Sequence, residues 1–263
     1  MTSPKRVVLS VLFCFLTASV FAQVPGKSLD SLRVQVMRRP ELADASLLRR
    51  IMSYREKDQN ILLAASANGD MELIRQLAVV LPDSGVFLST TASRENAFHL
   101  AKDYDTALAL LKTYSVLRLR EKPGEKDVFD RRAFKVALIN ASTFAGETPV
   151  MTQIKRGNYA VAVLYLAKNA DLTLQTNEGD TPLHLAVKQA QGGARDAVDL
   201  VESFLRGNPY TVFLKDAQGR TALDLAKELK ARFAYEKIKE IQDQERESSI
   251  RNVQIRLANW FKR

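Results

Sequence analysis

The sequence predicts an all-α protein, a solenoid of stacked helix pairs, and the prediction depends on three observations. A ten-residue motif at 177–186 joins a polar turn containing glycine to the start of a helix. The motif recurs upstream at 144–151 and downstream at 216–226. The threonines of consecutive copies are 33 and then 40 residues apart. A helix-starting motif at such a period indicates repeated units that bury a shared core by stacking on one another.

Each position of the motif has a physical role in starting a helix. The hydroxyl of Thr181 can cap the helix, and Pro182 suits the first helical position because its missing N–H would have no partner there. A glycine precedes the threonine by two residues in all three copies, as Gly146, Gly179 and Gly219. We expect these glycines to adopt positive φ, which a tight turn of this kind requires.

This pattern resembles the ankyrin repeats, whose signature is a polar turn followed by Thr-Pro-Leu-His. Weaker copies begin at Asn60 and Asn96, so the resemblance covers about residues 59–232. It implies an ankyrin-repeat solenoid of about five helix–turn–helix units with short hairpin tips. In this family the signature histidine bonds the backbone of neighbouring turns, which implies a structural role for His99 and His184.

Residues 1–22 are interpreted as an export signal. A basic start, with Lys5 and Arg6, precedes an apolar run of about 15 residues, and Ala22 supplies the small residue that signal peptidase needs. A retained membrane anchor is the alternative, although roughly 20 apolar residues are needed to span a bilayer. Cys14 is the only cysteine, so removal of the signal would leave no thiol for a disulfide, a metal site or catalysis.

The chain carries a formal net charge of +9, which falls to +7 if the signal with its two basic residues is removed. Such a charge permits an acidic partner or an anionic surface. Acidic and basic residues are interspersed along the chain, however, and this pattern is typical of an ordinary solvated surface. Hydrophobic residues make up 46% of the sequence, enough for a core in a chain of this length.

Three segments flank or interrupt the repeats. Residues 23–58 contain two runs of helical spacing separated by Pro40, and we expect a helical cap there. Residues 115–143 form an insertion, with a charged loop followed by a helix at 129–139; it is either a binding element or an enlarged second helix of its repeat. Residues 233–263 have apolar residues at helical spacing and are expected to form a long C-terminal capping helix.

The sequence lacks the motifs of common catalytic and cofactor sites. A glycine-rich phosphate loop, a serine nucleophile elbow and a paired-histidine zinc motif are all missing, and aromatic residues lack the basic interleaving of a nucleic-acid platform. We therefore predict a protein without catalytic residues, cofactor or metal. Its expected function is a non-enzymatic scaffold that binds another protein in the exported compartment, periplasmic or secreted. Two alternatives remain open: anion or membrane-surface binding through basic residues, and an enzyme site in the 115–143 insertion.

The resemblance also implies where a partner would bind, because ankyrin proteins use their hairpin tips and the concave face of their first helices. Carried over by position, the candidate residues are Glu147, Glu178 and Arg220 at the tips and Lys155, Arg156, Lys188 and Gln189 at the helix ends. The three cations Lys155, Arg156 and Lys188 are expected to lie close together, which would favour an acidic patch on the partner.

Overall fold

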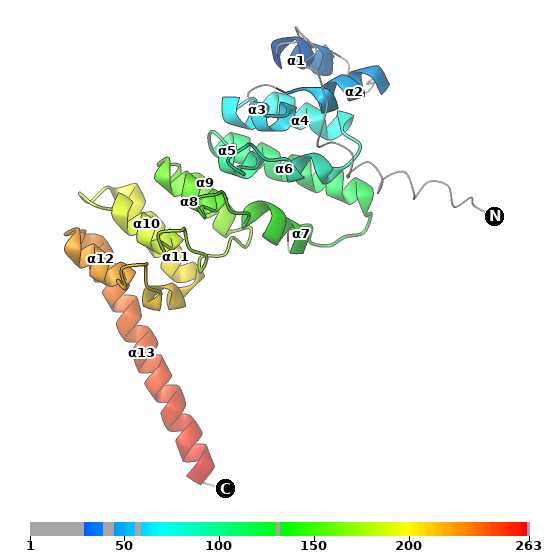
Figure 1. The fold of residues 1–263 in the computed structure, drawn as a ribbon. Coiled ribbons are helices and arrows are strands. Elements are labelled where there is room, and N and C mark those ends of the chain that lie inside the picture. The colour runs from blue at the N-terminus through cyan, green and yellow to red at the C-terminus, as the bar shows by residue number, and fades with distance from the viewer. Residues whose placement is uncertain (1–28, 39–44, 56–58, 130–131, 262–263) are drawn as a thin grey trace.

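The computed structural model describes residues 29–38, 45–55, 59–129 and 132–261, so the predicted signal at 1–22 lies outside the described residues. Helices dominate the described part and stack as antiparallel pairs in a curved array (Figure 1). Within these residues no strand is formed, and β-structure is limited to isolated bridge residues, namely Lys215 with Thr221, and Gln59. The predicted all-α solenoid is confirmed.

Five helix pairs form the array. They are α3 (Ile61–Asn68) with α4 (Met71–Val80), α5 (Ala97–Leu100) with α6 (Tyr104–Glu121), α8 (Pro149–Lys155) with α9 (Tyr159–Leu166), α10 (Pro182–Gln189) with α11 (Arg195–Gly207), and α12 (Ala222–Glu228) with α13 (Arg232–Phe261). The first members of the pairs, here called inner helices, pack on one another, and so do the second members, the outer helices. Two parallel layers result, and the core lies between them.

Short helical segments complete the chain: α1 (Leu29–Arg38), α2 (Ala45–Ser53), η3 (Ser84–Leu88), α7 (Arg132–Phe134), η4 (Lys135–Ile139) and η5 (Pro209–Phe213). Helix α1, which lies in the segment where we expect an N-terminal cap, packs on α4. There Arg33 pairs with Asp70, the residue that caps α4, at 2.5 Å. At the other end α13 buries Ala234 and Ile238 and then leaves the solenoid as a single helix (Figure 1).

The 115–143 insertion contributes to the core. Its first residues extend α6, which has 18 residues against eight in α9, so residues 115–121 belong to a long second helix of their repeat. The helix predicted at 129–139 begins at Arg132 and ends in the π-helical turn η4. Phe134 is fully buried, and its ring meets that of Phe98 edge-on at 5.8 Å.

The predicted caps start the inner helices, with one exception. The Asn60 side chain accepts a hydrogen bond from Leu63 N–H at 2.8 Å, and Thr181 and Thr221 accept equivalent bonds from the third helical residue. Thr148 occupies the same place in α8, but its buried hydroxyl has no hydrogen-bond partner. The cause is Met151, three residues later, which also changes a contact between repeats described below.

Candidate partner-binding surface

Four hairpin tips of the same geometry lie along one edge of the array. They comprise residues 91–95, 143–147, 176–180 and 216–220. In each tip the N–H of the first residue donates to the carbonyl of the fifth, at 2.9 to 3.0 Å. The side chain of the first residue also accepts from the N–H of the fifth, as Thr176 does from Asp180 at 3.2 Å. Each tip is therefore closed by the same local hydrogen bonds.

The turn glycines have the predicted conformation and a second role. Gly146, Gly179 and Gly219 have φ of 77°, 79° and 77°, which confirms the expectation of positive φ. A Cβ atom on Gly179 would lie 2.3 Å from the backbone nitrogen of Ala217, and one on Gly146 would lie 2.8 Å from that of Asn177. These two glycines thus allow each tip to approach the next.

Backbone hydrogen bonds join the tips into one surface, here called the tip strip. The N–H of Phe144 donates to Ser93 at 3.3 Å, that of Asn177 to Ala145 at 3.0 Å, and that of Ala217 to Glu178 at 3.2 Å. Every tip from 91–95 to 216–220 is bonded in this way to the next. The tip strip is therefore preorganised, unlike a set of independent loops.

The two histidines hold consecutive repeats together. His99 Nδ1 accepts from the N–H of Asn96 at 3.1 Å, and its Nε2 donates to the carbonyl of Glu147 in the next tip at 3.1 Å. His184 makes the same contact with the carbonyl of Arg220, also at 3.1 Å. Burial lowers the pKa of His99 to about 4 and also lowers the pKa of His184. Both rings are neutral at neutral pH, and their expected structural role is confirmed.

The third repeat departs from this arrangement because Met151 stands where the histidine would be. The N–H of Thr148 meets the Met151 sulfur at 3.4 Å, and a thioether cannot donate a bond to the next tip. In the fourth repeat the Thr181 hydroxyl donates a hydrogen bond to Nδ1 of His184 at 2.8 Å. Thr148 has no imidazole to donate to, which explains its unpartnered hydroxyl. The contact between the third and fourth repeats therefore lacks the histidine bond.

The predicted basic patch is a row of ion pairs. Lys155 pairs with Glu147 at 2.5 Å, Lys188 with Asp180 at 2.5 Å, and Arg220 with Glu228 at 2.8 Å. Each pair joins the last residue of a tip to the end of the following inner helix, eight residues later. The cations of this row are thus neutralised within their own repeats, which sequence reasoning did not foresee.

Arg156 points to the preceding repeat, toward α5. It donates to the carbonyl of His99 at 2.6 Å and pairs with Glu95 at 3.4 Å. The buried amide of Gln153 also donates there, to the carbonyls of His99 and Ala101 at 3.0 and 2.9 Å. These bonds satisfy the C-terminal carbonyls of α5, which has only four residues. Arg156 therefore has a structural role that its position alone did not reveal.

The two remaining candidates differ in exposure. Glu178 is exposed in its tip, and among the described residues it forms no ion pair. Gln189, the last residue of α10, is half-buried, and its side-chain oxygen lies 3.4 Å from the hydroxyl of Tyr159 on α9. Glu178 is thus free to meet a partner, whereas Gln189 is engaged with the neighbouring outer helix.

Sequence reasoning missed the most exposed apolar side chain of the tip strip. Phe144 is 66% exposed, and the guanidinium of Arg94 lies over its ring at 5.2 Å. Asn177 donates from its side-chain amide to the Phe144 carbonyl at 2.8 Å, which holds the backbone in place. The available signal was an aromatic residue at a tip position where a polar residue suits the turn.

The described residues lack the features of two other kinds of site. No helix in 29–38, 45–55, 59–129 or 132–261 is long and apolar enough to cross a bilayer. In the same part of the chain, no three His, Cys, Asp or Glu side chains are grouped so that they could hold a metal ion.

Comparisons with known proteins find ankyrin repeats within residues 132–216. The family described as ankyrin repeats (many copies) matches residues 132–186, and the family described as ankyrin repeat matches residues 178–216. A relative from Rickettsia bellii (strain RML369-C), named "Putative ankyrin repeat protein", is 35% identical over 71 residues. That stretch covers 27% of this chain and 40% of the length of the relative.

Proposed function

Since the chain is an ankyrin-repeat protein, we propose that it is a non-enzymatic scaffold that binds another protein along the tip strip and the adjoining ends of the inner helices. Ankyrin repeats suggest a protein–protein interaction domain. The observation that carries the choice of surface is the exposed ring of Phe144 on a rigid, hydrogen-bonded tip. Aromatic residues that protrude from a preorganised backbone are typical centres of binding energy.

The ion pairs beside the tip strip support a proposal about the chemistry of the partner. Lys155 and Lys188 already have carboxylate partners at 2.5 Å, so a simple acidic patch would gain little from them. We propose a partner with an apolar socket for Phe144, surrounded by groups of both charges. Glu178, exposed and unpaired among the described residues, would meet a cation of that rim.

We further propose that the protein works in an exported compartment, periplasmic or secreted. This proposal depends on the signal pattern of residues 1–22. N-terminal sequencing of the protein recovered from the exported fraction of its own cells tests it. A chain that begins at Gln23 supports export, whereas recovery of the uncleaved chain from the cytoplasmic fraction contradicts it.

Capture experiments with matched variants test the binding surface. The full chain is immobilised, exposed to the exported fraction of its own cells, and compared with the variants Phe144→Ala and Phe233→Ala. Phe233 is the matched control because it is an exposed phenylalanine, 58% accessible, on α13 near the inter-helix turn at Gly193. We expect a protein that Phe233→Ala retains and Phe144→Ala loses.

The affinity of the captured partner then gives the magnitude. Truncation of an aromatic anchor at a protein interface commonly costs about 2 kcal/mol or more, which corresponds to a loss of about thirtyfold. Thermal unfolding of both variants should match the wild type, because an exposed side chain contributes little to the core. Equal affinity of the two variants for the partner would remove the tip strip as the binding surface.

A further inference from the structure

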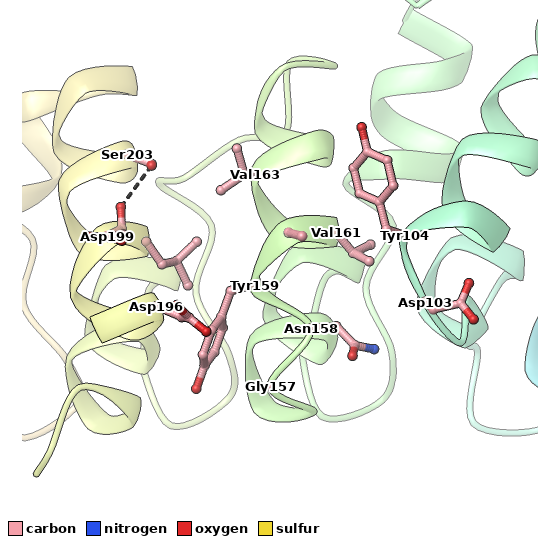
Figure 2. A pocket seen from close by; sticks show the side chains of 12 residues that line it. Asp103, Tyr104, Gly157, Asn158, Tyr159, Val161, Val163, Asp196, Asp199 and Ser203 are labelled. Atoms are coloured by element: carbon pink, nitrogen blue, oxygen red, sulfur yellow. Dashed lines mark hydrogen bonds between the residues drawn. The ribbon is translucent and has the colours of Figure 1, made fainter. Parts of the chain in front are cut away.

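A second surface of the molecule, on the outer helices, has the features of a binding groove. It is hollowed over α9, between the start of α6 and the first half of α11, with a volume of about 450 Å³ (Figure 2). Tyr104 and Asp103 lie on the α6 side, and Asp196 and Asp199 on the α11 side. This outer groove does not include the tip strip or the ion pairs beside it.

The groove exists because α9 is short and its outward side chains are small. It has eight residues, between an α6 of 18 and an α11 of 13. Ala160 and Val163 are exposed, and Val163 is 39% accessible. The outward positions of a helix at the surface usually carry polar side chains. The floor of the outer groove is therefore apolar and lies lower than its two sides.

The sides of the groove carry carboxylates without cations. Asp196 and Asp199 are exposed, and no ion pair among the described residues involves them. Asp103 accepts from the hydroxyl of Thr106 at 2.6 Å, and these bonds lower its pKa, so it is ionised at neutral pH. The chain as a whole is basic, with a net charge of +9. A locally acidic, apolar groove in such a chain would attract a basic, apolar segment.

The C-terminal part of α13 has the complementary character. Ile250 is 59% exposed, and Arg246 and Arg251 are exposed and form no ion pair among the described residues. The sequence continues with Val253, Leu257 and Trp260 at helical spacing. The helix has 30 residues, about 45 Å at 1.5 Å per residue, and extends away from the solenoid (Figure 1). An unbent helix of this length cannot return to the groove of its own chain.

We propose that the outer groove binds the C-terminal end of α13 from a second copy of this chain. The apolar face that contains Ile250 covers Ala160 and Val163, and Arg246, one turn before Ile250 on the same face of α13, meets Asp196 and Asp199. Two different surfaces meet in this contact, so it is heterologous and leads to dimers that can add further copies. The groove is small, so the association is weak and depends on concentration.

Charge reversal on each surface tests the proposal in the full chain. One variant carries Asp196→Arg and Asp199→Arg, and the other carries Arg246→Asp. Sedimentation velocity over a range of concentrations reports the average mass. We expect the wild type to associate as concentration rises, and each variant alone to associate at least about tenfold more weakly, because like charges then face each other. Asp30→Arg, which adds positive charge at an exposed position on α1, should behave like the wild type.

Mixing the two reversed variants separates a specific contact from a general effect of net charge. The reversed groove of the first then faces the reversed helix of the second, with opposite charges again in contact. The unchanged groove of the second likewise faces the unchanged helix of the first, so we expect the mixture to associate about as strongly as the wild type, although neither variant does so alone. A wild type that stays monomeric at every concentration overturns the proposal, and so does a mixture that behaves as the sum of its parts. Matching far-UV circular dichroism melts establish that both variants are folded.

Discussion

Replacing the turn glycines by alanine separates the dihedral cost of positive φ from the steric cost at the contact between neighbouring tips. Gly179 and Gly219 have nearly the same φ, 79° and 77°. A Cβ atom on Gly219 would have no heavy atom within 4 Å. A Cβ atom on Gly179 would lie 2.3 Å from the nitrogen of Ala217, at the place where the tips hydrogen-bond to each other. The two substitutions therefore share a dihedral cost and differ in a steric one.

The magnitudes follow from these contacts. Forcing an alanine into the left-handed region costs roughly 1–2 kcal/mol, and this alone is expected for Gly219→Ala. For Gly179→Ala the clash is with backbone, which no side-chain rotation can relieve, so the 176–180 and 216–220 tips must move apart. This loss adds to the dihedral cost, and we expect a total of roughly 3 kcal/mol.

Urea unfolding of each full-length variant, monitored by circular dichroism, measures its free energy of unfolding. The difference between the variants is the informative quantity, because the dihedral cost cancels in it. A Gly179→Ala variant no less stable than Gly219→Ala would refute the inference that the tips are held in contact. Phe144→Ala serves as a control for a change at a tip that leaves the backbone bonds intact.

Three further predictions concern single side chains. His99 is buried and has a pKa lowered to about 4, so as the pH falls the unfolded chain binds this proton before the folded chain does. The free energy of unfolding should therefore fall by up to roughly 3 kcal/mol as the pH drops from about 6.5 to 4. His99→Gln should flatten that part of the pH–stability curve. Lys188→Met removes the cation from the Asp180 carboxylate, which is 3% exposed, and should lower the free energy of unfolding in urea by about 1–3 kcal/mol. Lys155→Met breaks a more exposed pair and should change it by no more than about 0.5 kcal/mol. Equal effects of the two substitutions would contradict this expected difference. Thr181→Val should lower the unfolding free energy by about 1 kcal/mol, but Thr148→Val should be neutral, because only the first hydroxyl is bonded.

Sequence reasoning succeeded where the structure depends on neighbours in the chain. The cap at Thr181 and the positive φ of Gly179 involve bonds within a few residues, so a motif can specify them. The partners of Lys155 and Lys188 also lie only eight residues away. They were missed because an ion pair between a tip and a helix end depends on the angle at which the helix begins.

Features that depend on several repeats could not be predicted in this way. The backward contact of Arg156 exists because α5 in the preceding repeat is short, which places carbonyls within its reach. The outer groove depends on three helices of unequal length, and no segment of the sequence specifies it alone. Phe144 could have been recognised, since an aromatic residue at a tip has no role in the turn.

The substitution of Met151 for a histidine makes one contact in the array unlike its neighbours. His99 and His184 bond across the contacts before and after it, but between the third and fourth repeats the histidine bond is missing, and the tip strip, apolar packing and the side-chain contact of Tyr159 with Gln189 remain. Unfolding in a linear array is governed by such nearest-neighbour contacts. We therefore expect two cooperative blocks, which part between α8 and α10, and amide hydrogen exchange would show this as two groups of opening energies. A partner bound across both blocks would stabilise the contact between them, and its affinity would depend on how stable that contact is in the free protein.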